Sequence, residues 1–492
     1  MLKPKAIFTA SAIIFALAVL FAPRLSGAQD EAEYSGALPS RSTLRYKIGT
    51  GKMRDIWVNP KTGSDNRSGS TRAAALKTLD AAWRKIPVNQ TLKTGVRINL
   101  LRGEYPKNSL PNYLENRRGT KWCPVIIRSA DGPGTAVLRG DLNVYNCAYF
   151  YLLDFTVAPR PSSDTLHFEK CDSILLRGLR LDGGKFVREG QSTPVAHDNL
   201  KINQSKNIFV EDCEISGADD NALDFVAVQN GHIARNKIYN ANDWVAYVKG
   251  GSANLFIEGN EIFGGGTGGF TAGQGTGFQW MIAPYLKYEA ENITVRDNFI
   301  HDCAGAGLGV NGGLNITMQN NTLMRVGSRD HAVEFVFGAR SCDGSASDDR
   351  SGCTTNLKKG GWGTTRIDDG ENFVRIPNKN IFFQNNVILN DAKVRTSQLF
   401  TIFGSYNGDA QNNSHAPRPA KADENLQIKN NVIWNQGETP LGIEGENDGC
   451  RDDNPTCNAP QLKNENTING EFPSLLDPAK RDYRVLQNTS KP

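Results

Sequence analysis

The stretch Asn207-Ile-Phe-Val-Glu-Asp-Cys213-Glu-Ile215 is the first of seven similar phrases in the chain. Each phrase starts with Asn, places apolar residues at alternate positions and carries a second small polar residue, usually Asn, six positions after the first. The starting Asn residues are 23, 24, 38, 23, 65 and 45 residues apart, so the intervals correspond to single coils, coils with insertions and one pair of coils. The other phrases are Asn230–Ile238, Asn254–Ile262, Asn292–Ile300, Asn315–Leu323, Asn380–Ile388 and Asn425–Ile433.

A repeat interval in the low twenties indicates a solenoid, and alternation of apolar residues makes its repeating element a strand. Strands stacked in successive turns form a parallel β-helix, in which each coil is hydrogen-bonded only to its neighbours. Asn suits the bends because it tolerates left-handed backbone angles and its amide can bond the Asn of the coils above and below. The sequence therefore predicts an all-β chain that forms one long parallel β-helix.

The repeated phrases resemble those of the right-handed parallel β-helix superfamily of the pectate lyases and their relatives, over roughly residues 50–440. The resemblance implies a right-handed, single-stranded β-helix, a fold that carries many different chemistries. Residues 50–105 are similar to the start of many exported members of this superfamily. We expect them to cap the open end of the solenoid with a helix that buries Leu79, Ala82, Trp83 and Ile86.

The first residues have the layout of a secretory signal. Lys3 and Lys5 precede an apolar run, and small residues end at Ala28. An uncleaved membrane anchor is the alternative, because the run approaches spanning length. The expected parts are a signal peptide at 1–28, a linker at 29–49, the β-helix at 50–440 with its capping module at 50–105 and loop insertions at 264–291 and 340–372, and a loop-rich C-terminal cap at 441–492.

Charge and cysteine content fit an exported protein. Removal of the three basic residues before Gln29 lowers the formal net charge from +4 to +1, which gives no reason to expect nucleic acid or an anionic membrane as partner. We therefore expect a secreted monomer, extracellular or periplasmic. Disulfides form in that environment, and the pairs Cys342–Cys353 and Cys450–Cys457 are expected to staple polar loops.

Candidate functional groups occupy outward positions on consecutive coils. If Leu223 and Phe225 point inward, alternation directs Asp224 outward, and the same rule directs Tyr247 and Lys249 outward one coil later. Since adjacent coils lie about 4.8 Å apart, such side chains form a strip along one face. The candidates are Asp198, Asp219, Asp220, Asp224, Trp244, Tyr247, Lys249, Gln274, Asn311 and Glu334.

This combination suits β-elimination on an acidic, uronate-containing polysaccharide. Ca²⁺ held by Asp oxygens can neutralise the substrate carboxylate, and a Lys with a lowered pKa can remove the neighbouring proton. We predict Lys249 as the base and Gln274 and Asn311 as substrate-binding groups. Trp244 and Tyr247 are predicted either to stack on sugar rings or to cover a coil edge. The predicted Ca²⁺ ligands are Asp198, Asp219, Asp220 and Asp224.

The Asp cluster and the segment Lys249-Gly-Gly-Ser252 resemble the calcium site and the catalytic Lys segment of β-helix polysaccharide lyases. The Asp cluster has one residue more than that pattern. Phe270 and Thr271 stand where the alginate and chondroitin lyases have an assisting Arg. Each group also has a structural interpretation, because Asp often caps turns and an outward Lys is often only solvated.

A second cluster comprises Arg329, His331 and Glu334, with His301-Asp302 one coil earlier. We predict His331 and Glu334 as acid–base groups and Arg329 as a carboxylate-binding residue, with a salt-bridged turn as the alternative.

Two other functions compete with the lyase. A glycoside hydrolase is suggested by Asp219-Asp220, Gly231-His232 and Lys249, which resemble parts of the catalytic set of β-helix hydrolases, although Tyr247 replaces an Arg of that set. A non-catalytic glycan-binding or surface-structural β-helix is the third interpretation.

Overall fold

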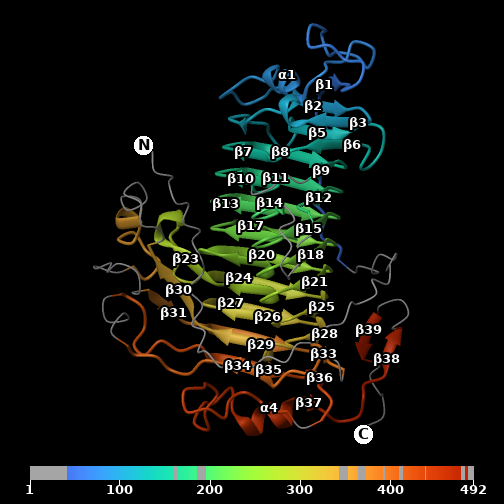
Figure 1. Cartoon of the computed structure of the whole chain (residues 1–492). Coiled ribbons are helices and arrows are strands. Elements are labelled where there is room, and N and C mark those ends of the chain that lie inside the picture. Colours follow the sequence, from blue (N-terminus) through green and yellow to red (C-terminus); the bar gives the residue numbers. More distant parts are fainter. Residues whose placement is uncertain are drawn as a thin grey trace, which may run out of the picture.

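Three long parallel sheets form the sides of a stack of coils in the computed structural model (Figure 1). They contain 12, 12 and 10 strands, and each coil contributes one strand to each sheet in turn, which confirms the right-handed parallel β-helix. We call them sheets A, B and C. The structure describes residues 42–158, 163–184, 195–342, 353–363, 373–391, 394–408, 414–437 and 439–477 and the backbone of 482–485, so the predicted signal peptide lies outside the described residues.

Sheet A begins at the N-terminal end of the stack. Its strands are β1 (Met53–Val58), β2 (Gly95–Leu100), β5 (Val125–Ser129), β8 (Ala148–Leu153), β11 (Asp172–Arg177), β14 (Lys206–Glu211), β17 (Gln229–Ala234), β20 (Ser252–Glu258), β24 (Ala290–Arg296), β27 (Gly313–Gln319), β32 (Lys379–Gln384) and β35 (Glu424–Lys429).

Sheet B follows sheet A in each coil. Its strands are β3 (Gly103–Pro106), β6 (Ala136–Arg139), β9 (Thr156–Ala158), β12 (Arg180–Asp182), β15 (Glu214–Ala218), β18 (Lys237–Ala241), β21 (Glu261–Gly265), β25 (Phe299–Cys303), β28 (Thr322–Val326), β33 (Val387–Leu389), β36 (Val432–Trp434) and β37 (Thr467–Ile468).

Sheet C carries the candidate functional residues. Its strands are β4 (Leu114–Glu115), β7 (Leu142–Tyr145), β10 (Leu166–Glu169), β13 (Leu200–Asn203), β16 (Leu223–Val226), β19 (Trp244–Lys249), β22 (Gly268–Gly273), β26 (Ala306–Asn311), β29 (His331–Val336) and β34 (Gln398–Ile402).

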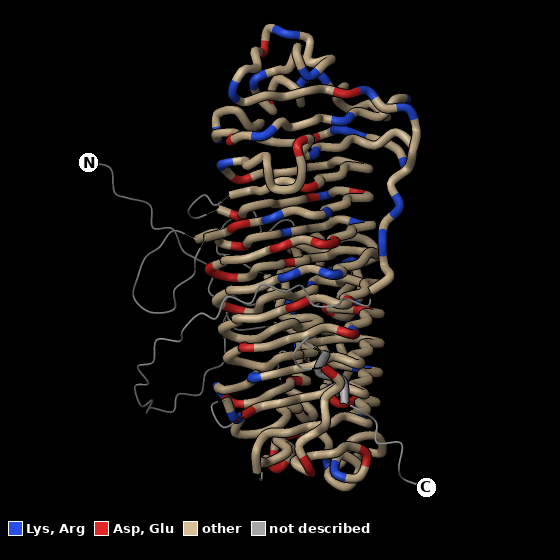
Figure 2. Tube along the Cα trace, turned by 90° about the vertical axis from the view of Figure 1, so that its right-hand side faces the viewer, with Lys and Arg blue, Asp and Glu red and all other residues tan. Residues whose placement is uncertain are grey.

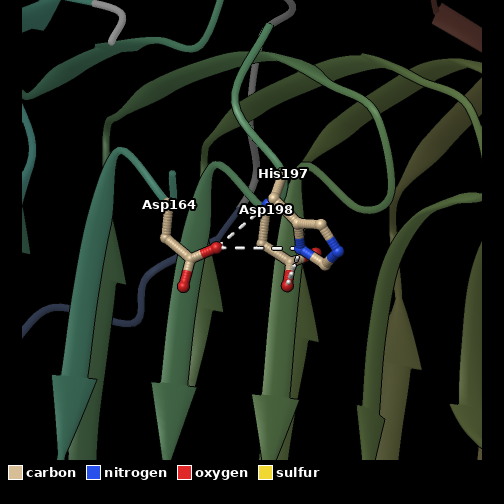
Figure 3. A group of neighbouring side chains, drawn as sticks. All are labelled: Asp164, His197 and Asp198. Carbon is tan, nitrogen blue, oxygen red and sulfur yellow. Dashed lines mark hydrogen bonds and ion pairs between the residues drawn. The ribbon is translucent and has the colours of Figure 1, made fainter. Parts of the chain in front are cut away.

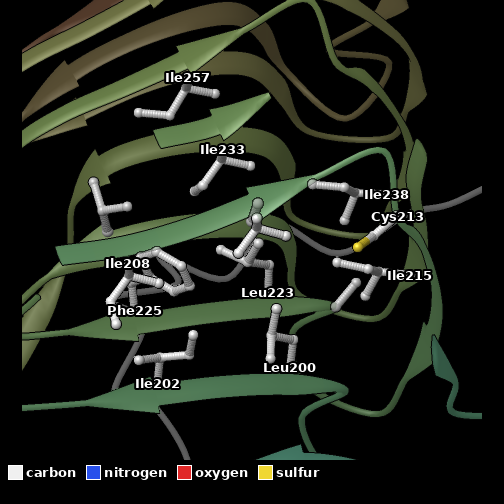
Figure 4. Close-up of a cluster of buried hydrophobic side chains, with 14 of the residues drawn as sticks. Leu200, Ile202, Ile208, Cys213, Ile215, Leu223, Phe225, Ile233, Ile238 and Ile257 are labelled. Atoms are coloured by element: carbon white, nitrogen blue, oxygen red, sulfur yellow. The ribbon is translucent and has the colours of Figure 1, made fainter. Parts of the chain in front are cut away.

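The core is a set of apolar ladders inside the stack (Figure 4). On sheet C, Ile202, Phe225 and Val248 are in register on successive strands and are fully buried. Full burial of such a side chain contributes roughly 1.5–3 kcal/mol. Because the same inward positions repeat in every coil, the residues between them point outward and are free to carry function.

Two Asn ladders explain the repeated phrase. The first Asn of each phrase has a left-handed backbone, as at Asn207 (φ 57°) and Asn230 (φ 61°), which agrees with the prediction from its side chain. The second Asn is buried at the next bend, where Asn236 donates from both its backbone N–H (2.9 Å) and its side-chain amide (3.0 Å) to Asn260 Oδ1. The ladder continues through Asn298, Asn321, Asn386, Asn431 and Asn466.

Helices close both ends of the stack. Helix α1 (Leu79–Arg84) starts at the N-cap Thr78 and buries Leu79, Ala82 and Trp83, which confirms the predicted capping helix. Helix α4 (Ala459–Glu465) lies at the opposite end against β35 and was not predicted. In Figure 1, α1 is at the top and α4 at the bottom. The described chain also has two short 3₁₀ helices, η1 (Lys107–Ser109) and η2 (Phe278–Trp280), and a hairpin of β38 (Leu475–Asp477) and β39 (Asp482–Val485).

Residues 42–52 form a strap along the outer face of sheet A, visible at one edge of the stack in Figure 2. Tyr46 stacks on Phe209 (ring centroids 4.4 Å apart) and its hydroxyl lies 2.8 Å from that of Tyr151. At one end of the strap Arg235 donates to the carbonyl of Leu44, and at the other Gly95 donates to that of Lys52. Part of the segment expected to be a linker (29–49) therefore packs on the solenoid.

A wall stands beside the edge of sheet C where its strands end. It consists of η2 and a small sheet of β23 (Gly275–Gly277), β30 (Gly338–Ser341) and β31 (Val374–Ile376), at the left of Figure 1. Arg340 is fully buried in the wall and pairs with Glu289 (2.5 Å). The Glu289 carboxylate also accepts a hydrogen bond from the backbone N–H of Gly250 (3.0 Å), which directly follows β19. The wall is thus tied to the solenoid by a buried ion pair.

The first insertion is shorter than predicted. Residues 264–273 complete β21 and form β22, so the wall segment begins only after Gly273. The strands were missed because their many glycines hide the apolar alternation. The insertion predicted at 340–372 is described only at its ends and at 353–363. Both predicted disulfides, Cys342–Cys353 in the wall and Cys450–Cys457 in the C-terminal cap, are present. No helix within the described ranges is long and apolar enough to cross a membrane.

Candidate functional site

The candidate site is the outward face of sheet C from β10 to β29, which we call the strip. Strand register puts one side chain of each coil in a single row across it, because parallel strands pair residue by residue. The row reads His167, Lys201, Asp224, Tyr247, Thr271, Gly309 and Glu334. The turns that precede these strands add His197, Asp220 and Asp243, which are aligned by backbone hydrogen bonds.

Lys201 lies at the centre of an acidic pocket. Its Nζ is 2.5 Å from Asp198 Oδ2 and 2.9 Å from Asp224 Oδ2. Asp198 is 0% exposed and Asp224 2% exposed. Burial alone would lower the pKa of Lys201, but the charges of Asp224 and Asp198 outweigh it and raise that pKa above its ordinary value. The side chain is therefore a permanent ammonium ion.

Asp164 and His197 border this pocket at the start of β10 and β13 (Figure 3). His197 Nδ1 lies 3.4 Å from Asp198 Oδ2, and this hydrogen bond raises the pKa of His197 to about 9. Burial raises the pKa of Asp164. Burial also opposes ionisation of Asp198, but the contacts with His197 and Lys201 hold its pKa well below the usual range. At neutral pH the pocket thus contains two cations and at least one firmly ionised carboxylate.

Asp220 is the group best suited to exchange a proton near neutral pH. Burial, together with the charges of Asp198 and Asp243, raises the pKa of Asp220 to about 7. The backbone N–H of Asp243 donates to the Asp220 carbonyl (3.0 Å), so the two carboxylates occupy equivalent positions on adjacent coils. Adjacent coils are about 4.8 Å apart, which keeps the two groups close.

Tyr247, Lys249 and Gln274 meet in the middle of the strip. Lys249 Nζ lies 4.2 Å from the centre of the Tyr247 ring and donates to Gln274 Oε1 at 3.0 Å. The Gln274 amide donates in turn to Asp243 Oδ2 at 3.3 Å. Tyr247 is only 3% exposed, and burial among carboxylates such as Asp224 raises its pKa well above the usual range. Its phenol is consequently protonated at all moderate pH values.

Trp244 lies flat on the sheet instead of projecting from it. A Cβ on Gly268 would come within 2.4 Å of the Trp244 ring, and a Cβ on Gly309 within 2.9 Å, so two glycines make room for the indole. The side chains of Trp244 and Tyr247 are both buried, and Lys249 lies over the Tyr247 ring, so neither ring face is open for a sugar to stack on in this arrangement.

The far half of the strip is a chain of hydrogen bonds that leads from Thr271 to Asp330. Thr271 donates to Asn311 Oδ1 (2.7 Å), and Asn311 donates to Glu334 Oε1 (2.9 Å). His331 bonds Glu334 and Asp330, both at 3.0 Å. Burial lowers the pKa of His331, but these two contacts outweigh it and raise the pKa to about 9. The predicted residues Asn311, His331 and Glu334 are therefore brought together.

Other predicted residues lie outside this network. Asp219 is exposed in its turn, and Arg329 is exposed and donates to the carbonyl of Gly266 (3.1 Å). His301 stacks on Phe263 in sheet B. His232, part of the hydrolase interpretation, is on sheet A and bonds Glu211 (2.7 Å), on a different face from Asp220.

The predicted calcium ligands do not fit a calcium ion as they are arranged. Ca²⁺ requires six to eight oxygens at roughly 2.3–2.6 Å, but the Lys201 ammonium already lies between Asp198 and Asp224, and Asp219 is exposed. Asp164, His197 and Asp198 bring three potential ligand atoms within 4.8 Å of one another. With its raised pKa, however, His197 is protonated at neutral pH and has no lone pair to offer on the nitrogen that faces them.

Lys201, His197, Asp164 and Asp243 were missed in the sequence, although a signal for them was present. Lys201, Asp224 and Tyr247 are spaced 23 residues apart, as are His197, Asp220 and Asp243. That is the interval between the first two Asn phrases, so counting one coil back from Asp224 would have identified Lys201.

The wall borders the strip on the side where the sheet C strands end. Gln204, just after β13, donates to the carbonyl of Trp280 in η2 (3.1 Å), so the wall reaches the coil that carries Lys201. Trp280 itself is exposed. An extended ligand lying along the strip would therefore contact the wall as well.

Residues 162–281 and 196–340 match the family model for a right handed beta helix region, which agrees with the right-handed β-helix over that part of the chain. No curated protein sequence matches the chain.

Several solved structures match the chain at low sequence identity and with TM-scores below 0.5. A rhamnogalacturonan lyase is 12% identical over 79% of this chain and 89% of its own, with a TM-score of 0.47. A mannuronan C-5 epimerase A-module from Azotobacter vinelandii is 14% identical over 83% and 95%, with a TM-score of 0.44. A lacto-N-biosidase from Eubacterium ramulus is 11% identical over 84% and 67%, with a TM-score of 0.44.

Proposed function

We propose that this protein is a secreted carbohydrate-active enzyme that cleaves an acidic, uronate-containing polysaccharide by β-elimination in the strip. The observation that carries the proposal is the contact of Lys249 with both Gln274 and the Tyr247 ring. An ammonium and an amide side by side are suited to bind a carboxylate, and a protonated phenol beneath them is suited to give a proton to a leaving oxygen.

The roles follow from the charges of these groups. Lys249 and Gln274 bind the carboxylate of the uronate. Lys249 was predicted as the base; its place over the Tyr247 ring and beside Gln274 suits a role in binding the substrate carboxylate. Asp220, with a pKa of about 7, is ionised often enough to remove the proton beside the carboxylate.

Asp220 and Tyr247 together can account for both proton transfers of the elimination. Asp220 takes the proton from the carbon beside the carboxylate, a carbon–carbon double bond forms, and the bond to the sugar oxygen breaks as Tyr247 protonates that oxygen. Asp220 is one of the charges that raise the pKa of Tyr247, so the two groups lie near each other. Protonated Asp220, with a pKa of about 7, is the stronger acid and can return the captured proton to the phenolate. The four-Asp calcium set contributes no step to this scheme.

A glycoside hydrolase is the second candidate, favoured by the Asp220 and Asp243 pair. Retaining hydrolases use two carboxyl groups about 5–5.5 Å apart, one protonated and one ionised. Equivalent positions on adjacent coils, about 4.8 Å apart, approach that separation. In this case Asp220 would act as the acid.

An ultraviolet assay on pectate, alginate and glycosaminoglycans tests the proposal, because elimination alone leaves a conjugated product that absorbs near ~235 nm. We expect absorbance to rise, and Lys249→Met, Tyr247→Phe and Asp220→Asn each to reduce kcat/KM at least ~100-fold. Lys206→Met, which removes an exposed Lys from sheet A, is the matched control and should keep full activity.

The pH profile separates the two mechanisms. If Asp220 is the base, kcat/KM rises with pH through about 7; if it is the acid of a hydrolase, kcat/KM falls over the same range. New reducing ends without absorbance would replace the lyase with the hydrolase. Neither product on any polymer would favour the non-catalytic interpretation, a glycan-binding or surface-structural β-helix.

A further inference from the structure

The acidic pocket around Lys201 resembles a metal-ion site, because several carboxylates surround one positive charge. That charge is the Lys201 ammonium group. Asp198 and Asp224 approach Lys201 Nζ from adjacent coils at 2.5 and 2.9 Å, and Asp164 and Asp220 lie close enough to affect the charges there. Several carboxylates around one positive centre is the arrangement that hard divalent cations require. Here the positive centre is a primary ammonium.

The pocket also contains an acceptor that no group of the chain satisfies. Asp224 Oδ1 is buried and has no hydrogen-bond partner among the described residues, although Asp224 Oδ2 is bound by Lys201. A buried carboxylate oxygen without a partner costs free energy, because it has lost its water. It is also a ready ligand for any cation that can enter.

We propose that Lys201 is a resident cation that takes the place of a divalent metal ion, so that the native pocket excludes Ca²⁺ and accepts it only when Lys201 is removed. An ammonium within 3 Å of the shared oxygens repels a second cation and fills the space that it needs. Without the side chain, Asp198 and Asp224 retain the oxygens that contact Lys201 Nζ, and Asp164 lies beside Asp198. The inference concerns metal binding alone and stands whether or not the proposed reaction is correct.

The consequence for the sequence motif is direct. A cluster of Asp residues on successive coils predicts calcium only if no Lys or Arg occupies the equivalent position one coil away. In this chain that position is Lys201, 23 residues before Asp224.

Calcium binding to Lys201→Ala tests the proposal, with isothermal titration of CaCl₂ and thermal unfolding in CaCl₂ or EDTA. The native protein should show no heat assigned to this pocket and the same unfolding temperature in both conditions. Lys201→Ala should be less stable in EDTA, regain at least ~3 °C in millimolar CaCl₂ and bind with a Kd on the order of 10⁻⁵ to 10⁻³ M. Adding Asp224→Asn to this variant should abolish the binding.

Lys107→Ala is the matched control. Lys107 bonds the single carboxylate of Asp141 at 2.9 Å, so its removal leaves one anion and should create no calcium site. Lys201→Gln, which keeps a hydrogen-bond donor for the carboxylates, replaces Lys201→Ala if the latter fails to fold.

Two results would overturn the proposal. The first is calcium binding by the native protein that Asp224→Asn removes. The second is a folded Lys201→Ala or Lys201→Gln protein that binds no calcium.

Discussion

Arg340 in the wall and Lys201 in the strip are both cations held by buried carboxylates, yet their surroundings differ. Arg340 donates to Glu289 and to the carbonyls of three consecutive residues, and the second oxygen of Glu289 accepts from Thr276 and Gly250. Around Lys201 one carboxylate oxygen, Asp224 Oδ1, remains without a partner among the described residues.

The difference separates an ion pair whose oxygens are all satisfied from one that leaves a buried acceptor unsatisfied. A fully satisfied network fixes one geometry, because any rearrangement leaves a buried charge unpaired. In the strip, one buried acceptor is unsatisfied, and neighbouring carboxyl groups have pKa values shifted in opposite directions, as at Asp198 and Asp220. Both features cost stability and are typical of functional sites. This contrast is consistent with the proposed catalytic role of the strip and with a structural role of the wall.

The largest effect on stability is expected from a substitution that disrupts the fully hydrogen-bonded network around Arg340. Arg340→Leu leaves Glu289 as a buried charge without its ion-pair partner, which should cost about 3–5 kcal/mol of stability and release the wall from the solenoid. Chemical denaturation and limited proteolysis of the wall measure it. Arg84→Ala, which removes an exposed ion pair with Asp80, should leave both readouts unchanged. An Arg340→Leu protein as stable as the native one would remove the basis of the comparison.

A smaller effect, of opposite sign, is expected in the strip. The folded-state pKa of Asp220, about 7, lies above its unfolded value, so the stability that the protonated form contributes is present below pH 4 and is lost as pH rises through 7. Asp220→Asn cannot ionise. It should therefore be more stable than the native protein at pH 8, by about 1–3 kcal/mol, and equally stable at pH 4.

Unfolding midpoints at these two pH values check this prediction, and activity is measured on the same samples. Greater stability with lost activity would mark Asp220 as a group kept for function. Equal stability at pH 8 would show that burial does not penalise its charge.

The smallest effect concerns His331, a half-buried cation with both ring nitrogens bonded. Its folded-state pKa, about 9, is raised, so its contribution is fully present below pH 6.5 and disappears as pH rises through 9. Between pH 6 and 9.5 the native protein should therefore lose more stability than His331→Gln. We expect a difference of only about 1 kcal/mol, because solvent screens the ion pair of His331 with the exposed Asp330. The exposed His415→Gln is the control. Parallel stability curves for all three proteins would contradict the assignment.

The fold was predictable because its determinants are local and repeated. The Asn phrases specify a left-handed residue and a buried amide in every coil, and alternation around Leu223 and Phe225 specifies which side chains face outward. The site was predictable only in part. Asp198, Asp224, Tyr247 and Lys249 were selected as candidates because their side chains are ionisable or aromatic, and the structure places them together on the strip.

What could not be predicted depends on contacts between coils. Lys201 is one residue among many lysines until its register with Asp224 is known. The burial of Trp244 depends on Gly268 and Gly309, which come from later coils and give no signal of their own. The helix α4 was missed because a single turn-rich segment of seven helical residues carries little periodicity.

The strap has a consequence for the order in which the molecule assembles. Residues 42–52 contact strands from β2 to β17, so the surface that they recognise exists only after those coils have stacked in register. A coil paired one position out of register would turn Tyr151 or Phe209 inward and erase part of that surface. Docking of residues 42–52 therefore depends on correct register in the first half of the solenoid, and their contacts with Tyr151 and Phe209 stabilise that register once it has formed.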